Sequence, residues 1–314
     1  MMKLKGLLLT EGFHGMISQA EGLAKALDID FFHEKIELNN FWKFIPPKFT
    51  PIKKFVFNNE IKKDFDVIIS CGRKSVVPSI FLKKNSPKKI FNIHIQNPKI
   101  SLENFDIVVA PKHDEIKGKN VISTRGAIHY LTLEEINQNK NYLGNKIDRS
   151  KDVLALIIGG PNKYYQYTKK NIQKIFSLIN ENIIKQNLQL IVIPSMRTPI
   201  ETIELAKNYF GSEHLVVDNV DKKAYLSALS LSNFIVVTCD SSSMISESAL
   251  TGKPIYVAQI PTSKNDYRFQ NFRKLFKELN IIRDLGGNME NWNYKPLDET
   301  NRVATEIKKI FNRF

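Results

Sequence analysis

FIVVTCDSSSMISESALTGKPIYVAQIP, residues 234–261, is the stretch of sequence that indicates the fold most directly. Residues 234–238 form a short run rich in β-branched side chains, which indicates a buried parallel strand. Small polar residues able to cap a helix come next, and residues 244–250 predict a short helix that ends at Gly252, before Pro254. A second apolar run at residues 255–258 completes a strand–helix–strand unit.

The turn between the first of these strands and the helix carries Asp240, Ser241, Ser242 and Ser243. Loops at the carboxyl ends of parallel strands commonly hold ligands, and hydroxyl groups and helix N–H groups there suit an anion. Glu247 follows Ser243 by four residues, one more than an S-x-x-E capping box requires, so its carboxylate is a candidate to bind sugar hydroxyls. The alternative is a capped helix whose glutamate is favoured by the helix dipole, and the local pattern does not decide between the two.

The same alternation of apolar runs and helical periodicity extends along the chain. It predicts strands at residues 6–9, 31–36, 67–70, 90–95, 107–110, 121–123, 153–158, 190–193 and 215–217, and helices at 18–27, 168–185 and 297–314. A polar stretch at residues 144–151 marks the expected domain boundary. We therefore expect an α/β protein with two Rossmann-like domains, residues 1–147 and residues 148–314, the second including a terminal helix that packs back.

Several predicted strands end in glycine or ionisable residues, which places these residues at ligand-binding edges of the sheets. Gly159 and Gly160 allow close backbone approach to a phosphate, and the Arg197 guanidinium suits one. In the first domain, His14 follows the first strand in a turn that lacks the G-x-G-x-x-G spacing of a dinucleotide site. Each of these residues alone is common in loops. Their recurrence after successive predicted strands is the stronger indication of a binding site.

The formal net charge of +14 is spread over both halves of the chain, and a basic surface attracts nucleic acid, anionic lipid or phosphorylated substrates. Nucleic acid is not expected as a partner, since RNP motifs, zinc-finger spacing and basic heptads are absent from the sequence. The scattered histidines and the lack of paired-cysteine spacing predict no metal site. Cys71 and Cys239, outside any C-x-x-C motif, are expected to be reduced thiols of a cytosolic protein.

The N-terminal apolar run is too short for a signal peptide, and no run approaches the ~20 residues that span a bilayer. The expected location is the cytoplasm, with peripheral attachment at the inner membrane as a further possibility. Residues 41–49, FWKFIPPKF, mix aromatics, prolines and lysines. The commoner interpretation is a loop with buried aromatics, and the alternative is contact with an anionic membrane surface, because aromatics and lysines favour that interface.

Seven blocks of sequence, in order along the chain, resemble the elongated-mitochondria fission protein family of plants and α-proteobacteria. They are GFHGMISQAEGLAKAL from residue 12, CGRKS from 71, FDIVVAPKHD from 105, NVISTRGA from 120, IGGPNK from 158, SMRTP from 195 and CDSSSMISESALTGKP from 239. That family in turn resembles the GT-B glycosyltransferases, notably the N-acetylglucosaminyl transferase of peptidoglycan assembly and lipid-A-disaccharide synthase. This second resemblance rests on the two-domain series and the S-x-x-x-E…G-x-P pattern.

The resemblance implies two Rossmann-like domains facing across a cleft, with a nucleotide-sugar held mainly by the C-terminal domain. Glu247 would bond the ribose hydroxyls, and Ser241, Ser242 and Gly160 would approach the diphosphate. Arg197 would oppose the charge on the leaving nucleotide. A uridine diphosphate sugar is the favoured donor, and neither a metal ion nor a cofactor is expected, because protein donors serve the phosphates.

On the same resemblance, Asn219 and Val220 would meet the base of the nucleotide. The acceptor, for which a lipid-linked molecule is one candidate, would enter from the N-terminal domain, with His14, His113 or Asp114 as candidate catalytic base. The expected function is thus metal-independent glycosyl transfer from a nucleotide-diphosphate sugar. The alternatives are a non-catalytic adaptor of the mitochondrial-fission type and a nucleotide-sugar epimerase, which fold alone does not separate.

Overall fold

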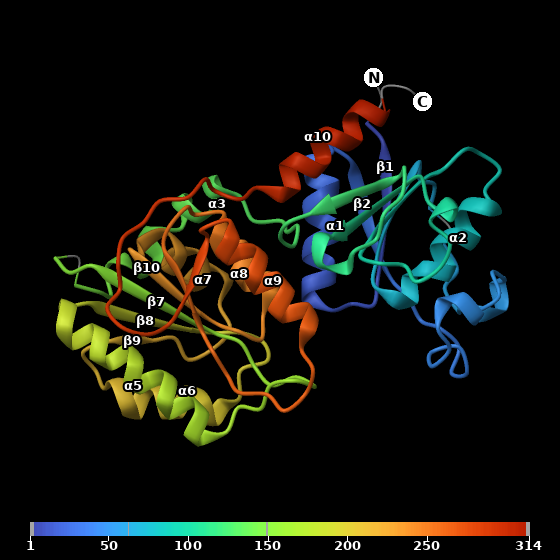
Figure 1. Cartoon of the computed structure of the whole chain (residues 1–314). Coiled ribbons are helices and arrows are strands. Elements are labelled where there is room, and N and C mark those ends of the chain that lie inside the picture. The colour runs from blue at the N-terminus through green and yellow to red at the C-terminus, as the bar shows by residue number, and fades with distance from the viewer. Residues whose placement is uncertain (1–2, 62, 149, 312–314) are drawn as a thin grey trace. The chain divides into compact units, whose positions relative to one another are not determined.

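The structure is a computed structural model that describes residues 3–61, 63–148 and 150–311 of the 314-residue chain. The chain forms two compact units, each built on a six-stranded sheet (Figure 1). Unit 1 comprises Met1–Tyr130 with Asp298–Phe314, and unit 2 comprises Leu131–Leu297. The last helix, red in Figure 1, therefore belongs with the blue and cyan elements of unit 1.

The sheet of unit 1 is parallel throughout, in the order β2-β1-β3-β4-β5-β6. Its strands are β1 (Lys5–Thr10), β2 (Asp30–Lys35), β3 (Val67–Cys71), β4 (Phe91–Ile95), β5 (Ile107–Pro111) and β6 (Val121–Thr124). The helices are α1 (His14–Ala26), α2 (Val76–Lys84) and α10 (Glu299–Phe311). Because every strand runs the same way, the loops that follow them gather at a single edge of the sheet.

Alternate strand residues of unit 1 face opposite sides of its sheet. Leu8 and Ile69, opposite each other in the β1–β3 register, lie in one core cluster with residues of α1 and α10. Leu7 and Ile68 lie in another cluster, with Val77 of α2 and apolar residues between β2 and β3. Both faces of the sheet are thus covered, which explains why its strands read as nearly continuous apolar runs.

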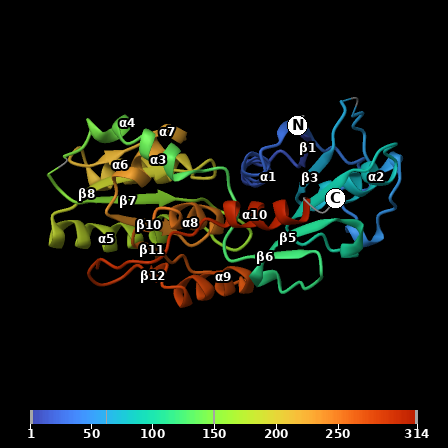
Figure 2. The same ribbon diagram turned by 90° about the horizontal axis from the view of Figure 1, so that it is seen from above.

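The sheet of unit 2 is also parallel, in the order β12-β11-β10-β7-β8-β9. Its strands are β7 (Val153–Ile158), β8 (Gln189–Pro194), β9 (Leu215–Val216), β10 (Phe234–Thr238), β11 (Ile255–Ala258) and β12 (Ile282–Asp284). Its helices are α3 (Leu133–Gln138), α4 (Asn141–Gly144), α5 (Lys169–Gln186), α6 (Ile200–Phe210), α7 (Lys222–Leu231), α8 (Ser242–Ala249) and α9 (Tyr267–Glu278). Figure 2 shows α3, α4 and α7 on one side of this sheet and α5 on the other.

The two-domain α/β class predicted from the sequence is confirmed, and each predicted strand is present within about one residue at either end. The predicted helices at 18–27 and 168–185 correspond to α1 and α5, although α1 begins four residues earlier. The predicted terminal helix corresponds to α10; residues 312–314 of that prediction lie outside the described residues. Within the described parts of the chain, no helix combines the length and the apolarity needed to cross a membrane.

The units divide the chain at residues 130 and 131, not at the expected 147 and 148. Residues 131–147 belong to unit 2 because α3 and α4 pack on α7, where Leu143 enters the core beside Ala224 and Ala228. The terminal helix α10 packs on α1 of unit 1, where Val303 and Ile307 are fully buried. The terminal helix therefore packs back as expected, but onto the first unit.

Candidate functional site

The turn between β10 and α8 places the small polar residues 240–243 at the carboxyl edge of the unit 2 sheet. Ser241 caps α8, since its hydroxyl accepts a hydrogen bond of 3.3 Å from the Met244 N–H. The helix begins at Ser242, two residues before the predicted start. Within the described residues, the N–H groups of Ser242 and Ser243 donate to no acceptor, as befits the first turn of a helix. These two N–H groups, with the helix dipole behind them, are suited to an anion.

Glu247 lies in the same helix and holds a carboxylate in a half-buried position. The surrounding protein withholds water from this carboxylate and raises its pKa to about 7, although a 2.8 Å hydrogen bond from the Tyr225 hydroxyl acts in the opposite direction. Glu247 is the sixth residue of α8, beyond the first turn where a helix dipole favours an acid. A favourable interaction with the helix dipole therefore does not explain why a carboxylate that is costly to ionise stands at this position.

Asp240 is the centre of a buried polar network behind this turn. Its side chain has no exposed surface, and it accepts hydrogen bonds from the Arg197 guanidinium at 2.8 Å, the Gly160 N–H at 3.1 Å and the Tyr167 hydroxyl at 2.5 Å. Burial beside Asp240 raises the pKa of the Tyr167 hydroxyl, which therefore stays protonated as a donor. The network joins the loops that follow β7, β8 and β10 into one assembly.

Gly159 and Gly160 serve this assembly directly. The Gly159 N–H donates to the Thr238 hydroxyl at 2.8 Å, so both glycine N–H groups have acceptors within the protein. A Cβ on Gly159 would lie 2.2 Å from an Asp240 carboxylate oxygen, and one on Gly160 would lie 1.9 Å from the Arg197 carbonyl oxygen. The glycines are thus required for close packing of these loops.

The loop after β9 carries Asn219 and Val220, both exposed. Asp221, the next residue, caps α7 by accepting from the N–H groups of Lys223 and Ala224. In the next turn of α7, Tyr225 reaches Glu247. The structure therefore connects the loop expected near the base with the residue expected near the ribose.

Sequence reasoning did not identify Tyr225, Tyr167 or Thr238 as parts of this site. Tyr225 is 22 residues from Glu247, and Tyr167 is 73 residues from Asp240. Isolated tyrosines in helices or loops carry no local motif, so only the packing of the elements reveals these pairs. The available signal was Asp240, an acid directly after an apolar strand, because a carboxylate that becomes buried there requires several donors nearby.

The candidate bases of unit 1 lie in two separate places. His14 begins α1 after β1 and is exposed, with its Nε2 atom 3.3 Å from the Tyr130 hydroxyl. His113 and Asp114 lie in the turn after β5, where the imidazole Nε2 and a carboxylate oxygen are 3.9 Å apart. Two strands, β3 and β4, separate β1 from β5, so the strand ends that precede the two sites are about 14 Å apart. The structure does not bring all three residues together.

Two units, each a six-stranded parallel sheet flanked by helices, give the chain a GT-B-like fold. The crystal structure of Methanocaldococcus jannaschii UDP-GlcNAc 2-epimerase in complex with UDP-GlcNAc and UDP matches this chain with a TM-score of 0.56, covering 100% of each chain at 14% identity. At so low an identity this similarity concerns the fold alone.

The chain belongs to the mitochondrial fission ELM1 family, whose sequence profile matches residues 14–311. It is 24% identical over 273 residues to the mitochondrial fission protein ELM1 of Arabidopsis thaliana, covering 77% of this chain and 63% of the plant protein. It is 27% identical over 281 residues to the uncharacterized protein RP120 of Rickettsia prowazekii (strain Madrid E), covering 77% of this chain and 79% of that protein. The match thus spans less than two thirds of the plant protein.

Proposed function

We propose that the protein is a glycosyltransferase that uses a nucleotide-diphosphate sugar, with a UDP-sugar as the favoured donor. The observation that carries this proposal is Glu247, a half-buried carboxylate with its pKa raised to about 7, six residues into a helix whose first N–H groups lack acceptors among the described residues. Carboxylates with raised pKa values in such positions are candidates for function. The solved epimerase structure of similar fold contains UDP, which supports the same ligand class here.

In this proposal the ribose hydroxyls donate hydrogen bonds to Glu247, and the diphosphate lies over the N–H groups of Ser242 and Ser243. Transfer breaks the bond between the anomeric carbon and the diphosphate oxygen, and forms a bond from that carbon to the acceptor hydroxyl oxygen. The nucleoside diphosphate leaves with the electron pair, and the helix N-terminus stabilises its added charge. The acceptor proton passes to a base, for which His14, His113 and Asp114 remain the candidates. Neither a cofactor nor a metal ion has a role in this scheme.

Uridine diphosphate is expected to bind, and to bind about tenfold or more tightly than uridine monophosphate. The additional phosphate gains charge-assisted hydrogen bonds from the first turn of α8, each contributing about 1.5–3 kcal/mol. A thermal-shift panel of uridine, UMP, UDP and UDP-sugars measures this order, since a ligand that binds the native state raises the melting temperature. No stabilisation by any nucleoside diphosphate at millimolar concentration would contradict the donor site and favour an adaptor role.

The reaction class is tested by incubating the protein with the UDP-sugar that stabilises it most and following the sugar by NMR spectroscopy. With water in place of the acceptor, slow release of UDP together with the free sugar of unchanged configuration at its other carbons is expected for a transferase, with loss of the anomeric phosphate coupling. An isomerised sugar that remains attached to UDP would show an epimerase instead.

We also propose that unit 1 attaches to anionic membrane surfaces through residues 41–55. Four phenylalanines of this segment are exposed, by 66% at Phe41, 83% at Phe44, 71% at Phe49 and 58% at Phe55. This exposure contradicts the commoner expectation that the aromatics of this loop are buried. Only Trp42 among the aromatic residues named here approaches that expectation, since it is half-buried and packs on the core. Lys43, Lys48, Lys53 and Lys54 lie in the same segment, and aromatics with lysines favour a membrane interface.

Replacing both Phe44 and Phe49 with serine is expected to reduce binding to phosphatidylserine vesicles by about 100-fold or more. Full insertion of a phenylalanine side chain contributes about 1.5–3 kcal/mol. Vesicle co-sedimentation at low salt measures the change. The control Ile184→Ser removes a side chain that is 72% exposed on α5 of unit 2 and should leave binding unchanged. Equal binding by the double variant and the control would mean that this segment does not contact lipid.

A further inference from the structure

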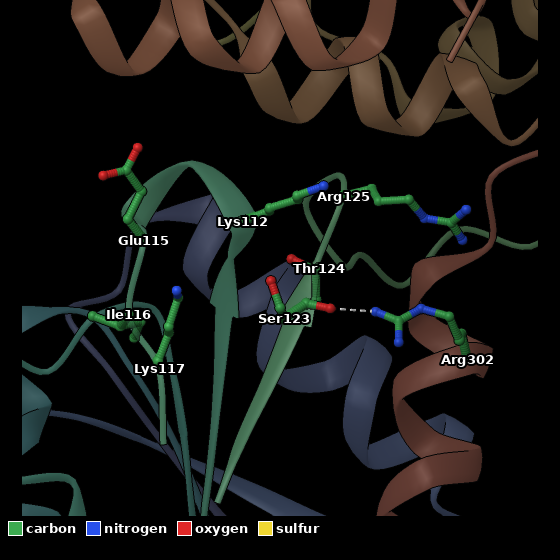
Figure 3. A pocket seen from close by; sticks show the side chains of 8 residues that line it. All are labelled: Lys112, Glu115, Ile116, Lys117, Ser123, Thr124, Arg125 and Arg302. Carbon is green, nitrogen blue, oxygen red and sulfur yellow. Dashed lines mark hydrogen bonds between the residues drawn. The ribbon is translucent and has the colours of Figure 1, made fainter. Parts of the chain in front are cut away.

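Unit 1 contains a basic pocket of about 890 Å³ at the carboxyl edge of its sheet (Figure 3). The loop after β5, the end of β6 and the first turn of α10 form its wall. The pocket is lined by Lys112, Glu115, Ile116, Lys117, Ser123, Thr124, Arg125 and Arg302. Four of these eight residues are cationic and one is acidic, so the pocket favours an anionic ligand.

One of the four cations, Arg302, has four of its five N–H groups engaged by the protein. The Arg302 guanidinium donates to both carboxylate oxygens of Glu299, to Glu306 at 2.6 Å and to the Ser123 carbonyl oxygen at 2.6 Å. Burial opposes ionisation of Glu299, but hydrogen bonds from Arg302 and Arg125 outweigh it and lower the pKa of this carboxyl. Arg302 and Glu299 therefore form a fixed wall, and Arg302 has little to offer a ligand.

The other three cations remain wholly or partly available. Arg125 donates to Glu299 through Nε and one terminal nitrogen, at 3.0 and 2.7 Å, which leaves its other terminal nitrogen for a ligand. Its side chain is 45% exposed. Lys112 and Lys117 form no ion pair with any described residue and are exposed. Figure 3 shows the Glu115 carboxylate directed away from the other lining side chains, and it forms no ion pair with a described residue.

We propose that this pocket binds the phosphate group of a phosphorylated organic molecule. Two lysines and the free edge of Arg125 supply charge for a phosphomonoester, which carries about −1.5 to −2 at neutral pH. Ser123 and Thr124 also line the pocket, and their hydroxyls are further hydrogen-bonding groups for a phosphate. The volume is in the range of about 300–1,000 Å³ typical of small-molecule sites, far more than one phosphate needs, so the ligand also carries an organic part.

The pocket lies beside the candidate bases His113 and Asp114, since Lys112 immediately precedes them in the turn after β5. If the protein is the transferase proposed above, the bound molecule is the acceptor, and that assignment rests on the proposed function. Phosphate binding itself does not, because the donor site lies in unit 2 and the pocket in unit 1.

The double variant Lys112→Gln/Lys117→Gln tests the proposal with glycerol 3-phosphate as the probe and glycerol as the neutral control. Calorimetry should show salt-sensitive binding of the phosphate to the wild-type protein, no binding of glycerol, and at least about a tenfold loss of affinity in the variant. Arg125 and Arg302 are kept, because removing either would leave the buried Glu299 carboxylate short of a partner. The matched control Lys84→Gln/Lys309→Gln changes the same charge at exposed positions of unit 1 outside the pocket.

A second experiment distinguishes a lipid headgroup from a soluble molecule as the source of the phosphate. It compares binding of the protein to vesicles that contain phosphatidic acid with binding to vesicles that contain an equal charge of phosphatidylserine. A lipid source predicts that the pocket variant loses its preference for phosphatidic acid, and a soluble source predicts binding of glycerol 3-phosphate without such a preference. Binding of neither probe to the wild-type protein, or an equal loss in the pocket variant and its control, would overturn the proposal. UDP affinity, measured on the same variants, should be unchanged, so failure of this site is distinguishable from failure of the donor site.

Discussion

Replacing Asp240 with alanine is expected to lower the free energy of unfolding of unit 2 by about 2–4 kcal/mol. The Asp240 carboxylate has no exposed surface and accepts hydrogen bonds from Gly160, Tyr167 and Arg197. Alanine would leave the buried Gly160 N–H without an acceptor, and each such loss costs about 1–3 kcal/mol. Arg197 is 43% exposed and can turn its charge toward water, so it contributes less to the loss.

Urea unfolding measures this change through Trp292 in a Trp42→Phe background, because the two tryptophans of the chain lie one in each unit. The control Asp218→Ala removes an exposed carboxylate that pairs with Lys207 at the surface, and should change stability by less than about 1 kcal/mol. If Asp240→Ala unfolds at the same urea concentration as this control, the network does not hold the three loops together.

Replacing Glu247 with glutamine is expected to weaken UDP binding by about 10- to 100-fold while making unit 2 more stable at pH 8. Glutamine keeps an oxygen for the Tyr225 hydroxyl but loses the charge that strengthens hydrogen bonds from the ribose. It also removes a carboxylate whose pKa rises from 4.5 to about 7 on folding. That rise corresponds to a destabilisation of at most about 3 kcal/mol when the group is ionised.

The pH dependence of this stability difference has a definite sign. Between about pH 4.5 and 7 the folded protein keeps the Glu247 proton and the unfolded chain releases it, so the wild-type protein loses stability as the pH rises. The variant's advantage should therefore be absent below about pH 4.5, grow through this window and be constant above it.

Melting curves at several pH values, with calorimetry of UDP at pH 8, measure both effects of Glu247→Gln. The control Glu201→Gln makes the same chemical change at an exposed position in the first turn of α6, and should alter neither affinity nor the pH dependence of stability. A glutamine variant at position 247 that melts lower than the wild-type protein and binds UDP equally well would show that Glu247 has only a structural role.

The fold was predictable because its strands are buried on both sides. Residues 153–158 and 234–238 are continuous apolar runs in the sequence, and the structure places β7 and β10 at those positions. The division into units was not predictable in the same way. Whether residues 131–147 join one unit or the other depends on contacts such as Leu143 against α7 and Tyr142 with Asp221, which join positions about 80 residues apart.

The candidate site was predictable as a set of loops, but not in its internal contacts. Glu247 stood out because it misses the capping-box spacing, and the structure shows its carboxylate bound to a tyrosine from another helix. Gly160 and Arg197 stood out as phosphate-type residues, whereas their hydrogen bonds in the structure are made with Asp240 and with each other. A sequence motif reports the residue types at a sheet edge, and packing determines which of their donors remain available.

A structure of the protein crystallised with UDP is the most direct test of the proposed donor site. We expect the two ribose hydroxyls within hydrogen-bonding distance of the Glu247 carboxylate, and phosphate oxygens within about 3 Å of the N–H groups of Ser242 and Ser243. The uracil should lie near the loop that carries Asn219 and Val220. UDP bound elsewhere, or no bound UDP at millimolar concentration with the β10–α8 turn open to solvent, would contradict the proposed donor site.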